Sequence, residues 1–201
     1  MSFAETDVAG APAMLGRITY TGDLGYEIWM APAFTRRVYR AIKEAGAAHE
    51  IVDFGMRALL SMRLEKNFPT WFRELRPIYG PYEAGLDRFV DLEKGDFIGR
   101  DAALKEKTEG PVLMRATFVV GAEDADVIGD EPVWHDGKVV GWITSGGYAH
   151  HVDASLAQGY IPAELAQAET DGFEIEILGV RRPAFLQLEP LFDPQGARMR
   201  M

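Results

Sequence analysis

The chain has 201 residues, of which 47% are hydrophobic and 26% charged, and it carries a formal net charge of −10. This composition is typical of a globular protein with one large or two small domains. The negative charge argues against nucleic acid or an anionic membrane surface as the main partner. The absence of cysteine excludes disulfides, thiolate metal sites and a cysteine nucleophile. With no long apolar run and no signal-peptide pattern, the sequence predicts a cytoplasmic protein.

The N-terminal part of the sequence predicts a loop followed by a hairpin. Residues 1–15 are rich in small side chains and show no sustained period, which is typical of a loop. Residues 17–30 then alternate apolar and polar side chains in two arms around a glycine-containing turn, which predicts two short strands. Glu27 falls one residue inside the second strand, and Tyr20 lies seven residues earlier. Across a tight turn, both side chains can serve one ligand.

The surroundings of Glu27 allow two interpretations. A carboxylate flanked by Tyr26 and Ile28 is expected to be partly desolvated, and a desolvated carboxylate seeks hydrogen-bond donors. A fused heterocycle with adjacent N–H and amino groups would supply two of them. The same pattern also fits an exposed glutamate on the solvent side of a hairpin.

Helical periodicity occurs three times in the first half of the chain. Residues 32–45 predict a helix with a proline in its first turn and a glycine just after its end. Residues 53–66 predict a second helix that begins at Asp53 as its N-cap. Its expected core stripe consists of Met56, Leu59, Leu60 and Leu64. A short third helix is expected over residues 101–107, ending at Gly110.

From residue 112 onward the pattern changes to short strands separated by turns, which is typical of a small antiparallel barrel or sandwich. Asp136 and Gly137 give the strongest hairpin signal. The expected strands cover residues 112–120, 132–135, 138–143, 155–161, 173–178 and 184–188. The predicted fold is therefore α+β: a small antiparallel sheet with two packed helices, followed by a C-terminal antiparallel β-barrel-like domain. The predicted divisions are a loop over 1–15, an α+β portion over 16–110 and a barrel over 111–201.

Residues 144–151 are expected to form a loop between two of these strands. His150 and His151 are adjacent there, and neighbouring side chains of an extended chain point in opposite directions. A metal site is therefore improbable, and the segment is expected to face a partner surface. No Gly-x-Gly-x-x-Gly occurs, so no dinucleotide site is predicted.

The hairpin sequence resembles a known family. Residues 20–28 read Tyr-Thr-Gly-Asp-Leu-Gly-Tyr-Glu-Ile and are similar to Tyr-Thr-Gly-Glu-Asp-Gly-x-Glu-Ile of the aminomethyltransferase, or glycine-cleavage T-protein, family. That family includes the tetrahydrofolate-binding halves of dimethylglycine and sarcosine dehydrogenases. Further stretches that resemble it are residues 62–65, 80–86, 91–102 and 190–196.

The resemblance implies roles for four residues. Tyr20 and Glu27 correspond to the tyrosine and the glutamate that contact the pterin of tetrahydrofolate. An aromatic residue at the position of Trp71 lies beside the folate rings, although the aromatic residues around Pro69 also fit ordinary loop packing. Arg73 is expected to supply positive charge for the glutamate tail of folate.

A fifth role is assigned to Arg57. The T-protein form of the second helix carries an Arg-Asp pair at the positions of Leu59 and Leu60. The arginine that would contact folate is therefore replaced, and Arg57 is the nearest substitute. The cofactor-binding residues predicted by sequence and resemblance are Tyr20, Glu27, Arg57, Trp71 and Arg73.

The resemblance implies the tetrahydrofolate-binding portion of a one-carbon transferase, which captures a one-carbon unit from an N-methyl amine such as dimethylglycine or sarcosine. The family's N-terminal portion carries the aspartate that would transfer protons, and that portion is expected to lie outside this sequence, so no catalytic residue is predicted. Expected partners are a flavin-dependent dehydrogenase domain or an N-terminal half on another chain. The alternatives are a non-catalytic folate-cleft module that needs such a partner, or an aminomethyltransferase or demethylase on the same scaffold.

Overall fold

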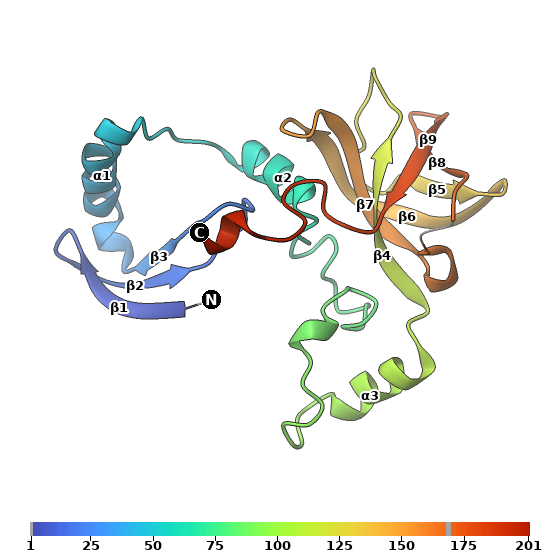
Figure 1. Cartoon of the computed structure of the whole chain (residues 1–201), viewed down its shortest axis with the longest axis horizontal. Helices are drawn as coiled ribbons and strands as arrows, with labels where there is room; N and C mark the ends of the chain where they lie inside the picture. Colours follow the sequence, from blue (N-terminus) through green and yellow to red (C-terminus); the bar gives the residue numbers. More distant parts are fainter. Residues whose placement is uncertain (1, 168–169) are drawn as a thin grey trace. The chain divides into compact units, whose positions relative to one another are not determined.

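The computed structural model describes residues 2–167 and 170–201 (Figure 1). The chain divides into two compact units. The first unit joins Met1–Arg63 to the C-terminal Gln195–Met201, and the second unit comprises Leu64–Pro194. The C-terminal residues therefore fold with the N-terminal sheet, from which they are remote in sequence.

The first unit contains a three-stranded antiparallel sheet in the order β1-β2-β3. Its strands are β1 (Ser2–Val8), β2 (Ala11–Arg17) and β3 (Glu27–Met30). The prediction of a loop over residues 1–15 was wrong, because this segment forms a hairpin. Ala9 and Gly10, at the turn, both have positive φ, of 54° and 75°, as the favoured two-residue hairpin turn requires. Small side chains gave no strand pattern, and pairing with a neighbouring strand overrides weak local preference.

The first predicted helix is confirmed. The 3-10 turn η1 (Pro32–Phe34) leads into α1 (Thr35–Gly46), and η2 (Ala47–His49) follows it. Val38 is the buried residue of α1.

The second helix, α2 (Met56–Glu65), begins three residues later than predicted. Asp53 does not cap it, because its carboxylate accepts a hydrogen bond from the Tyr39 hydroxyl (2.9 Å) and pairs with Lys43 (3.3 Å). The hydrogen bond from Tyr39 is the main cause that holds the pKa of Asp53 below its usual value. Of the predicted core stripe, Leu64 is buried but Met56 is 68% exposed.

The second unit begins with the last two residues of α2 and continues as irregular chain. This chain leads to the short turn η3 (Asp87–Phe89) and then to α3 (Arg100–Glu109). The third predicted helix is thus confirmed, and it ends at Gly110, whose φ is 84°. Glu106 of α3 accepts a hydrogen bond from the Glu83 backbone N–H at 2.8 Å, which ties the helix to the preceding loop.

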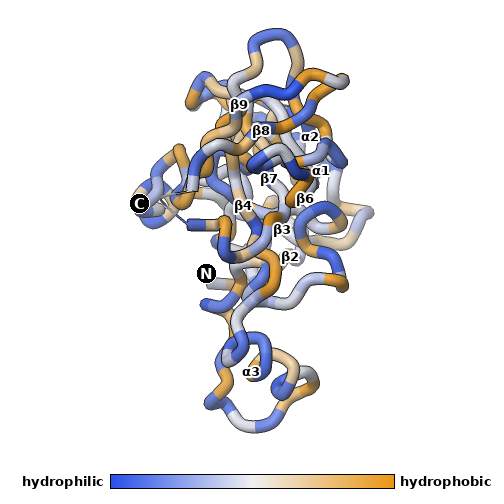
Figure 2. Tube along the Cα trace, turned by 90° about the vertical axis from the view of Figure 1, so that its right-hand side faces the viewer, coloured by the Kyte–Doolittle hydropathy of each residue, from blue (hydrophilic) through white to orange (hydrophobic). Residues whose placement is uncertain are grey.

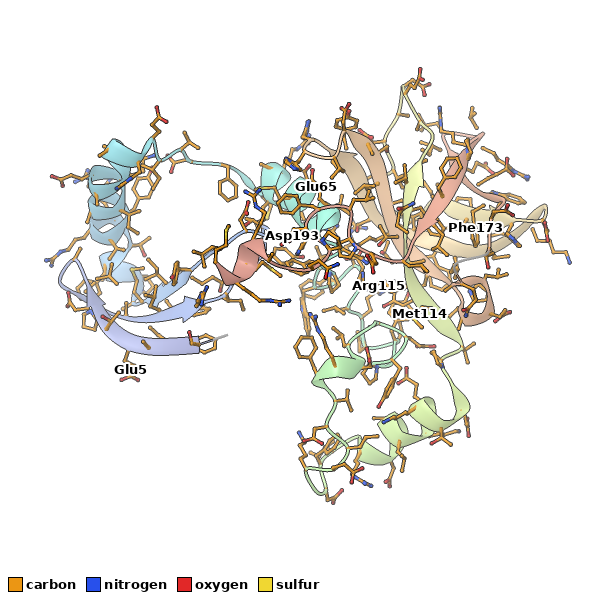
Figure 3. The ribbon with its side chains drawn as sticks, in the orientation of Figure 1. Glu5, Glu65, Met114, Arg115, Phe173 and Asp193 are labelled. Carbon is orange, nitrogen blue, oxygen red and sulfur yellow. The ribbon has the colours of Figure 1, made fainter. Side chains whose placement is uncertain are left out.

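The rest of the second unit is a closed antiparallel barrel in the order β4-β7-β6-β5-β8-β9, in which β9 pairs back to β4. Its strands are β4 (Leu113–Val120), β5 (Pro132–His135), β6 (Lys138–Ala149), β7 (Ala154–Pro162), β8 (Phe173–Ile177) and β9 (Val180–Gln187). The short turns η4 (Ala163–Leu165) and η5 (Arg198–Arg200) complete the chain. Phe118 of β4 and Phe173 of β8 meet edge to face in the core, at 5.3 Å between ring centroids. Figure 3 shows where Phe173 lies in the barrel. The predicted barrel is confirmed.

Strand β6 is longer than predicted. It continues through residues 144–149, so the loop expected over 144–151 was wrong for most of its length. A register shift between Ile143 and Ser145 lets the strand bend and still pair with β7. Gly146 is required there, because a Cβ at this position would lie 2.8 Å from the carbonyl oxygen of Leu156.

Hydrophilic and hydrophobic residues alternate at short intervals along the coloured trace, so no long apolar stretch stands out (Figure 2). Within residues 2–167 and 170–201, no helix has the length and apolar character needed to cross a membrane. The predicted domain boundary near residues 109–111 stays a prediction. The compact unit that holds the barrel begins at Leu64.

Candidate functional site

Glu27 lies on one face of the N-terminal sheet together with two aromatic rings. It is the first residue of β3 and pairs with Gly16 of β2, which pairs in turn with Phe3 of β1. Directly paired residues of antiparallel strands point to the same face, and Trp29 shares that face because it lies two residues after Glu27. The rings of Phe3 and Trp29 are 5.7 Å apart. Gly16 leaves room for them, since a Cβ there would lie 2.5 Å from the Trp29 ring.

The carboxylate of Glu27 is exposed, so the expected desolvation was wrong and the alternative interpretation is the one the structure shows. Neither flanking side chain covers it. Ile28 belongs to the opposite face of the sheet, and Tyr26 is 56% exposed. The carboxylate can therefore accept hydrogen bonds from donors that arrive from solvent, beside an aromatic surface.

Tyr20 lies in the connection between β2 and β3, which is longer than a tight turn. Strand β2 ends at Arg17, so the predicted first arm of the hairpin was wrong, and residues 18–26 form a loop. Thr19 explains part of this, because its Oγ1 accepts a hydrogen bond from the Thr21 backbone N–H at 3.2 Å. Such local bonds compete with strand pairing. Tyr20 is half-buried inside this loop, and Glu27 is the first paired residue after it.

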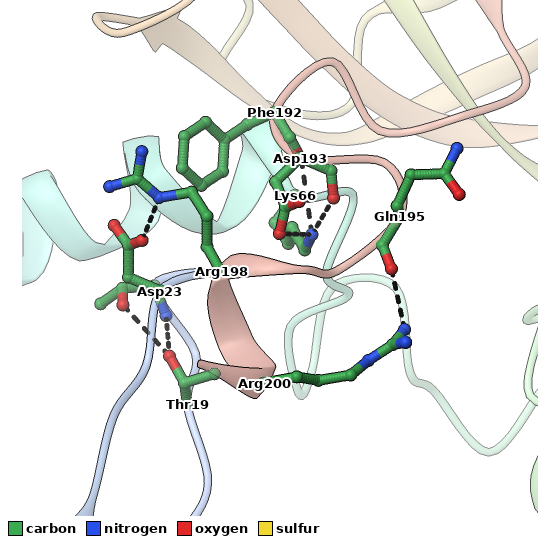
Figure 4. A network of polar contacts seen from close by, with 9 residues as sticks. Thr19, Asp23, Lys66, Phe192, Asp193, Gln195, Arg198 and Arg200 are labelled. Carbon is green, nitrogen blue, oxygen red and sulfur yellow. Dashed lines mark hydrogen bonds and ion pairs between the residues drawn. The ribbon is translucent and has the colours of Figure 1, made fainter.

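The C-terminal segment is bound to the same loop. Arg198 donates from Nε to the Asp23 carboxylate at 2.5 Å (Figure 4). Arg17, just before the loop, donates to the carbonyl oxygen of Met201 at 2.6 Å. The loop and the residue before it are thus both tied to the C-terminal residues. Sequence reasoning missed Arg198, because no local pattern connects residues 175 positions apart.

We expect Arg198→Gln to lower the free energy of unfolding of the first unit by about 1 kcal/mol or less, since the pair with Asp23 is half-exposed. The loss should shrink at high salt, because exposed charges are screened over roughly 10 Å at 0.1 M ionic strength. Urea unfolding at two salt concentrations measures this. Arg200→Gln is the matched control, because Arg200 donates only to the Gln195 carbonyl in this network. A loss that is independent of salt would contradict the ion-pair explanation.

Arg57 is the second residue of α2, and its side chain is exposed. Arg63, six residues later on the same helix, is only 2% exposed. Six residues correspond to a rotation that places the two side chains about 120° apart. Of these two arginines, Arg57 is therefore the one accessible to a ligand from solvent.

Trp71 lies in the second unit and projects into solvent. It is 71% exposed and its neighbour Phe72 is 80% exposed, with the two rings edge to face at 5.9 Å. Ordinary loop packing was the alternative for these aromatic residues, and it was wrong for both. Large exposed aromatic side chains side by side are a feature of binding surfaces.

Arg73 is also exposed, and its guanidinium lies against the loop between β4 and β5. Gly129 of that loop leaves room for it, since a Cβ there would lie 3.1 Å from one terminal nitrogen of Arg73. Trp71 and Arg73 thus belong to one compact unit, and Tyr20, Glu27 and Arg57 to the other.

Two histidines singled out in the sequence lie after β6. The His151 backbone N–H donates to the Glu65 carboxylate at 2.7 Å, and its ring meets the Phe192 ring at 4.9 Å. The ring of His150 packs against that of Tyr148. In the part of the chain that the structure describes, no group of three acidic or histidine side chains could hold a metal ion.

A cavity of about 990 Å³ lies at one end of the barrel and has an acidic lining. Its charged lining residues are Glu123, Asp124, Asp126, Asp153 and Arg182. Arg182 pairs with Asp124 at 2.6 Å, and the hydrogen bond from this arginine is the main cause that lowers the pKa of Asp124. The remaining carboxylates disfavour an anion, so this cavity does not suit the acidic tail of a folate.

Comparison with known proteins gives two family matches. Residues 1–94 match the GCVT N-terminal domain, and residues 114–193 match the glycine cleavage T-protein C-terminal barrel domain. The mitochondrial dimethylglycine dehydrogenase of Mus musculus is 39% identical over 97% of this chain and 22% of its own length. The mitochondrial sarcosine dehydrogenase of Mus musculus is 32% identical over 92% of this chain and 21% of its own length.

Shorter relatives are covered to a larger extent. The aminomethyltransferase of Streptomyces avermitilis is 35% identical over 94% of this chain and 51% of its own length. The crystal structure of the glycine cleavage system aminomethyltransferase T from Bartonella henselae has the same fold, with a TM-score of 0.82 over 90% of this chain and 50% of that one, at 23% identity. The chain thus spans about a fifth of the dehydrogenases and about half of the aminomethyltransferases. It belongs to the aminomethyltransferase, or glycine-cleavage T-protein, family and has relatives among the dimethylglycine and sarcosine dehydrogenases.

Proposed function

We propose that this chain is the tetrahydrofolate-binding portion of a one-carbon transferase that captures a one-carbon unit from an N-methyl amine such as dimethylglycine or sarcosine. Family membership and the names of the relatives support the reaction class. The observation that carries the proposal is the exposed Glu27 carboxylate on the sheet face that also carries the Phe3 and Trp29 rings.

The described residues fit the chemistry of a reduced folate. A carboxylate accepts two parallel hydrogen bonds, and the pterin offers adjacent N–H and amino donors to Glu27. The exposed ring of Trp71 offers a stacking surface, and the tyrosine hydroxyl of Tyr20 offers a further polar contact. Arg57 and Arg73 offer positive charge to the glutamate tail, which a chain with a net charge of −10 otherwise repels. When bound, tetrahydrofolate supplies the nitrogen atoms that take up the one-carbon unit.

The chain's own contribution is positioning. Holding the pterin at a fixed carboxylate converts an encounter between two molecules into a reaction within one complex, which raises the effective concentration of the reactants. We assign none of the reaction's proton transfers to this chain, which spans about a fifth of the dehydrogenases and half of the aminomethyltransferase.

A second candidate function is a cleft module that binds the cofactor only with a partner. Apolar side chains at and before the start of α2 favour it: Val52 is 77% exposed, Phe54 58% and Met56 68%. Large exposed apolar side chains this close together in the chain are a feature of protein interfaces. The proposed partner is a flavin-dependent dehydrogenase domain or the N-terminal half of the same fold, on this polypeptide or another.

Calorimetric titration with tetrahydrofolate under reducing conditions tests the proposal. We expect Glu27→Ala to weaken binding at least tenfold, about 1.4 kcal/mol, because the pterin donors lose their acceptor. Glu5→Ala is the matched control, since Glu5 is an exposed glutamate of the same sheet face, on β1 (Figure 3). Equal losses in both variants would contradict the role of Glu27.

Absence of binding by the wild-type chain would instead favour the cleft module. The same titration is then repeated with the full-length protein, in which the apolar segment at residues 52–56 is expected to be covered. If Glu27→Ala does not weaken binding in the full-length protein, the proposed site is overturned.

A further inference from the structure

Glu74 is a buried carboxylate directly beside the exposed residues Trp71 and Arg73. Its exposed fraction is 0%, although it lies in the same short segment. One carboxylate oxygen accepts hydrogen bonds from the backbone N–H and the hydroxyl of Thr70, both at 2.7 Å. The other accepts from the hydroxyls of Thr144 and Ser145 on β6, both at 2.5 Å. The carboxylate therefore joins the segment to the barrel wall.

Burial of a carboxylate is costly, and only a full set of donors offsets the cost. An apolar side chain of similar size fills such a space at a lower cost in free energy. The charge at Glu74 thus calls for an explanation other than packing. Thr70 and two hydroxyls of β6 donate their hydrogen bonds to this single side chain, which fixes Thr70 relative to β6.

The backbone around Glu74 is fixed by further contacts. Its carbonyl oxygen accepts a hydrogen bond from the Tyr160 hydroxyl at 2.9 Å. Burial raises the pKa of Tyr160, so this hydroxyl stays a donor. The Leu75 backbone N–H donates to the Thr70 carbonyl at 3.1 Å, which closes residues 70–75 into a compact loop.

This loop holds a strained residue. Phe72 has a φ of 71°, a conformation that residues other than glycine adopt only where the surrounding structure imposes it. The strained residue lies between Trp71 and Arg73, both of which are exposed. The carboxylate of Glu74 connects this loop to β6, and it is the buried contact next to the strained residue.

We propose that Glu74 is a positioning residue for cofactor binding: it fixes the loop of residues 70–75 so that Trp71 and Arg73 are held ready for tetrahydrofolate, without contacting the cofactor itself. This inference rests on the proposed function, since Trp71 and Arg73 are its assigned contacts. Because the loop is already fixed, it loses less conformational entropy when the cofactor binds.

The test measures the loop and the ligand separately. The chain contains four tryptophans, so 5-fluorotryptophan labelling gives four ¹⁹F resonances, and Trp71→Phe identifies that of Trp71. We expect Glu74→Ala to shift and broaden the Trp71 resonance and to weaken tetrahydrofolate binding at least tenfold in calorimetry. The resonance of Trp134, on β5, should not change.

Two further variants separate positioning from general stability. Glu74→Gln keeps an acceptor for Thr70 and should restore part of the binding and the Trp71 line shape. Phe118→Ala removes packing from the barrel core without removing any hydrogen bond to Glu74, so it should lower stability while it leaves the Trp71 resonance and binding unchanged under native conditions. If Glu74→Ala does not fold, Ser145→Ala removes one donor to the carboxylate and should move the Trp71 resonance in the same direction by a smaller amount.

The outcomes distinguish the two proposals. Tetrahydrofolate binding that is unchanged in Glu74→Ala, or a Trp71 resonance that does not move, overturns the positioning role. Absence of binding by both the wild-type chain and the full-length protein overturns the proposed function, and with it the role of Glu74 toward the cofactor. In that case a moved Trp71 resonance still shows that Glu74 fixes the loop.

Discussion

Replacement of Lys66 by methionine is expected to lower the free energy of unfolding of the second unit by about 3–5 kcal/mol. The side chain of Lys66 is 3% exposed, and its ammonium pairs at 3.2 Å with the carboxylate of Asp193, whose side chain is 10% exposed (Figure 4). The ammonium also donates to the backbone carbonyls of Phe192 and Asp193. Removal of the cation leaves a carboxylate and two carbonyls buried without this donor, and that desolvation is the source of the loss.

Urea unfolding followed by tryptophan fluorescence measures the loss. Lys105→Met is the matched control, because Lys105 and Glu109 form an exposed pair of 3.9 Å on α3, which we expect to contribute about 0.5 kcal/mol or less. Adding Asp193→Asn to Lys66→Met should recover part of the loss, since asparagine removes the buried charge and tolerates the positive φ of 42°. Equal costs for Lys66→Met and Lys105→Met would contradict the argument.

The buried Lys66–Asp193 pair lies close in sequence to the point where the chain passes from one compact unit to the other. Asp193 and Pro194 are the last residues of the second unit, and Gln195–Met201 belongs to the first, where Arg198 binds the loop of residues 18–26. The chain between the two units is therefore anchored on one side by Lys66 and on the other by Arg198.

The barrel could be predicted from sequence because its signals are local. Asp136 and Gly137 adopt φ values of 48° and 72°, which is the geometry that an Asp-Gly pair favours between two strands. Strict alternation over residues 173–177 gave a strand with buried and half-buried positions in turn. Each of these features is determined by residues within one hairpin.

The N-terminal hairpin and the end of β6 could not be predicted, because their stability comes from pairing rather than from pattern. Residues 2–8 alternate only weakly, and Gly146 and Gly147 read as loop residues. In the structure Gly146 is needed for the close approach of β7, which only the partner strand reveals. A prediction from local sequence places such glycines outside a strand, because glycine weakens strand interiors.

The buried charged residues were the feature of the structure that the sequence predicted least well. Arg63, Glu65 and Lys66 form a charged run that is typical of a solvated helix face, yet each is less than 5% exposed. Their burial depends on partners far away in sequence: Lys66 meets Asp193 at a separation of 127 residues, and Glu74 meets Ser145 at 71. The family resemblance assigned roles to exposed residues. It did not reveal the buried charged residues, such as Lys66 and Glu74.

Phe118→Ala is expected to lower the free energy of unfolding of the second unit by about 3–5 kcal/mol. Phe118 is fully buried in the barrel core, where its ring meets Phe173 edge to face at an interplanar angle of 65°. A closed barrel of six strands has no free edge that could move inward, so much of the volume of the lost ring remains as a cavity. The loss therefore combines the lost transfer free energy of the ring with the cost of that cavity.

Phe185→Ala on β9 is the matched control, because the same ring is removed from a residue that is 59% exposed, on a strand that pairs with β4. We expect it to cost about 1 kcal/mol or less, the scale of strand propensity. Guanidinium unfolding of the two variants, with the slope against denaturant held in common, gives both values. Equal costs would mean that the core around Phe118 relaxes into the space. That result would contradict the cavity argument, because a ring lost from a core that cannot close should cost more than a ring lost from the surface.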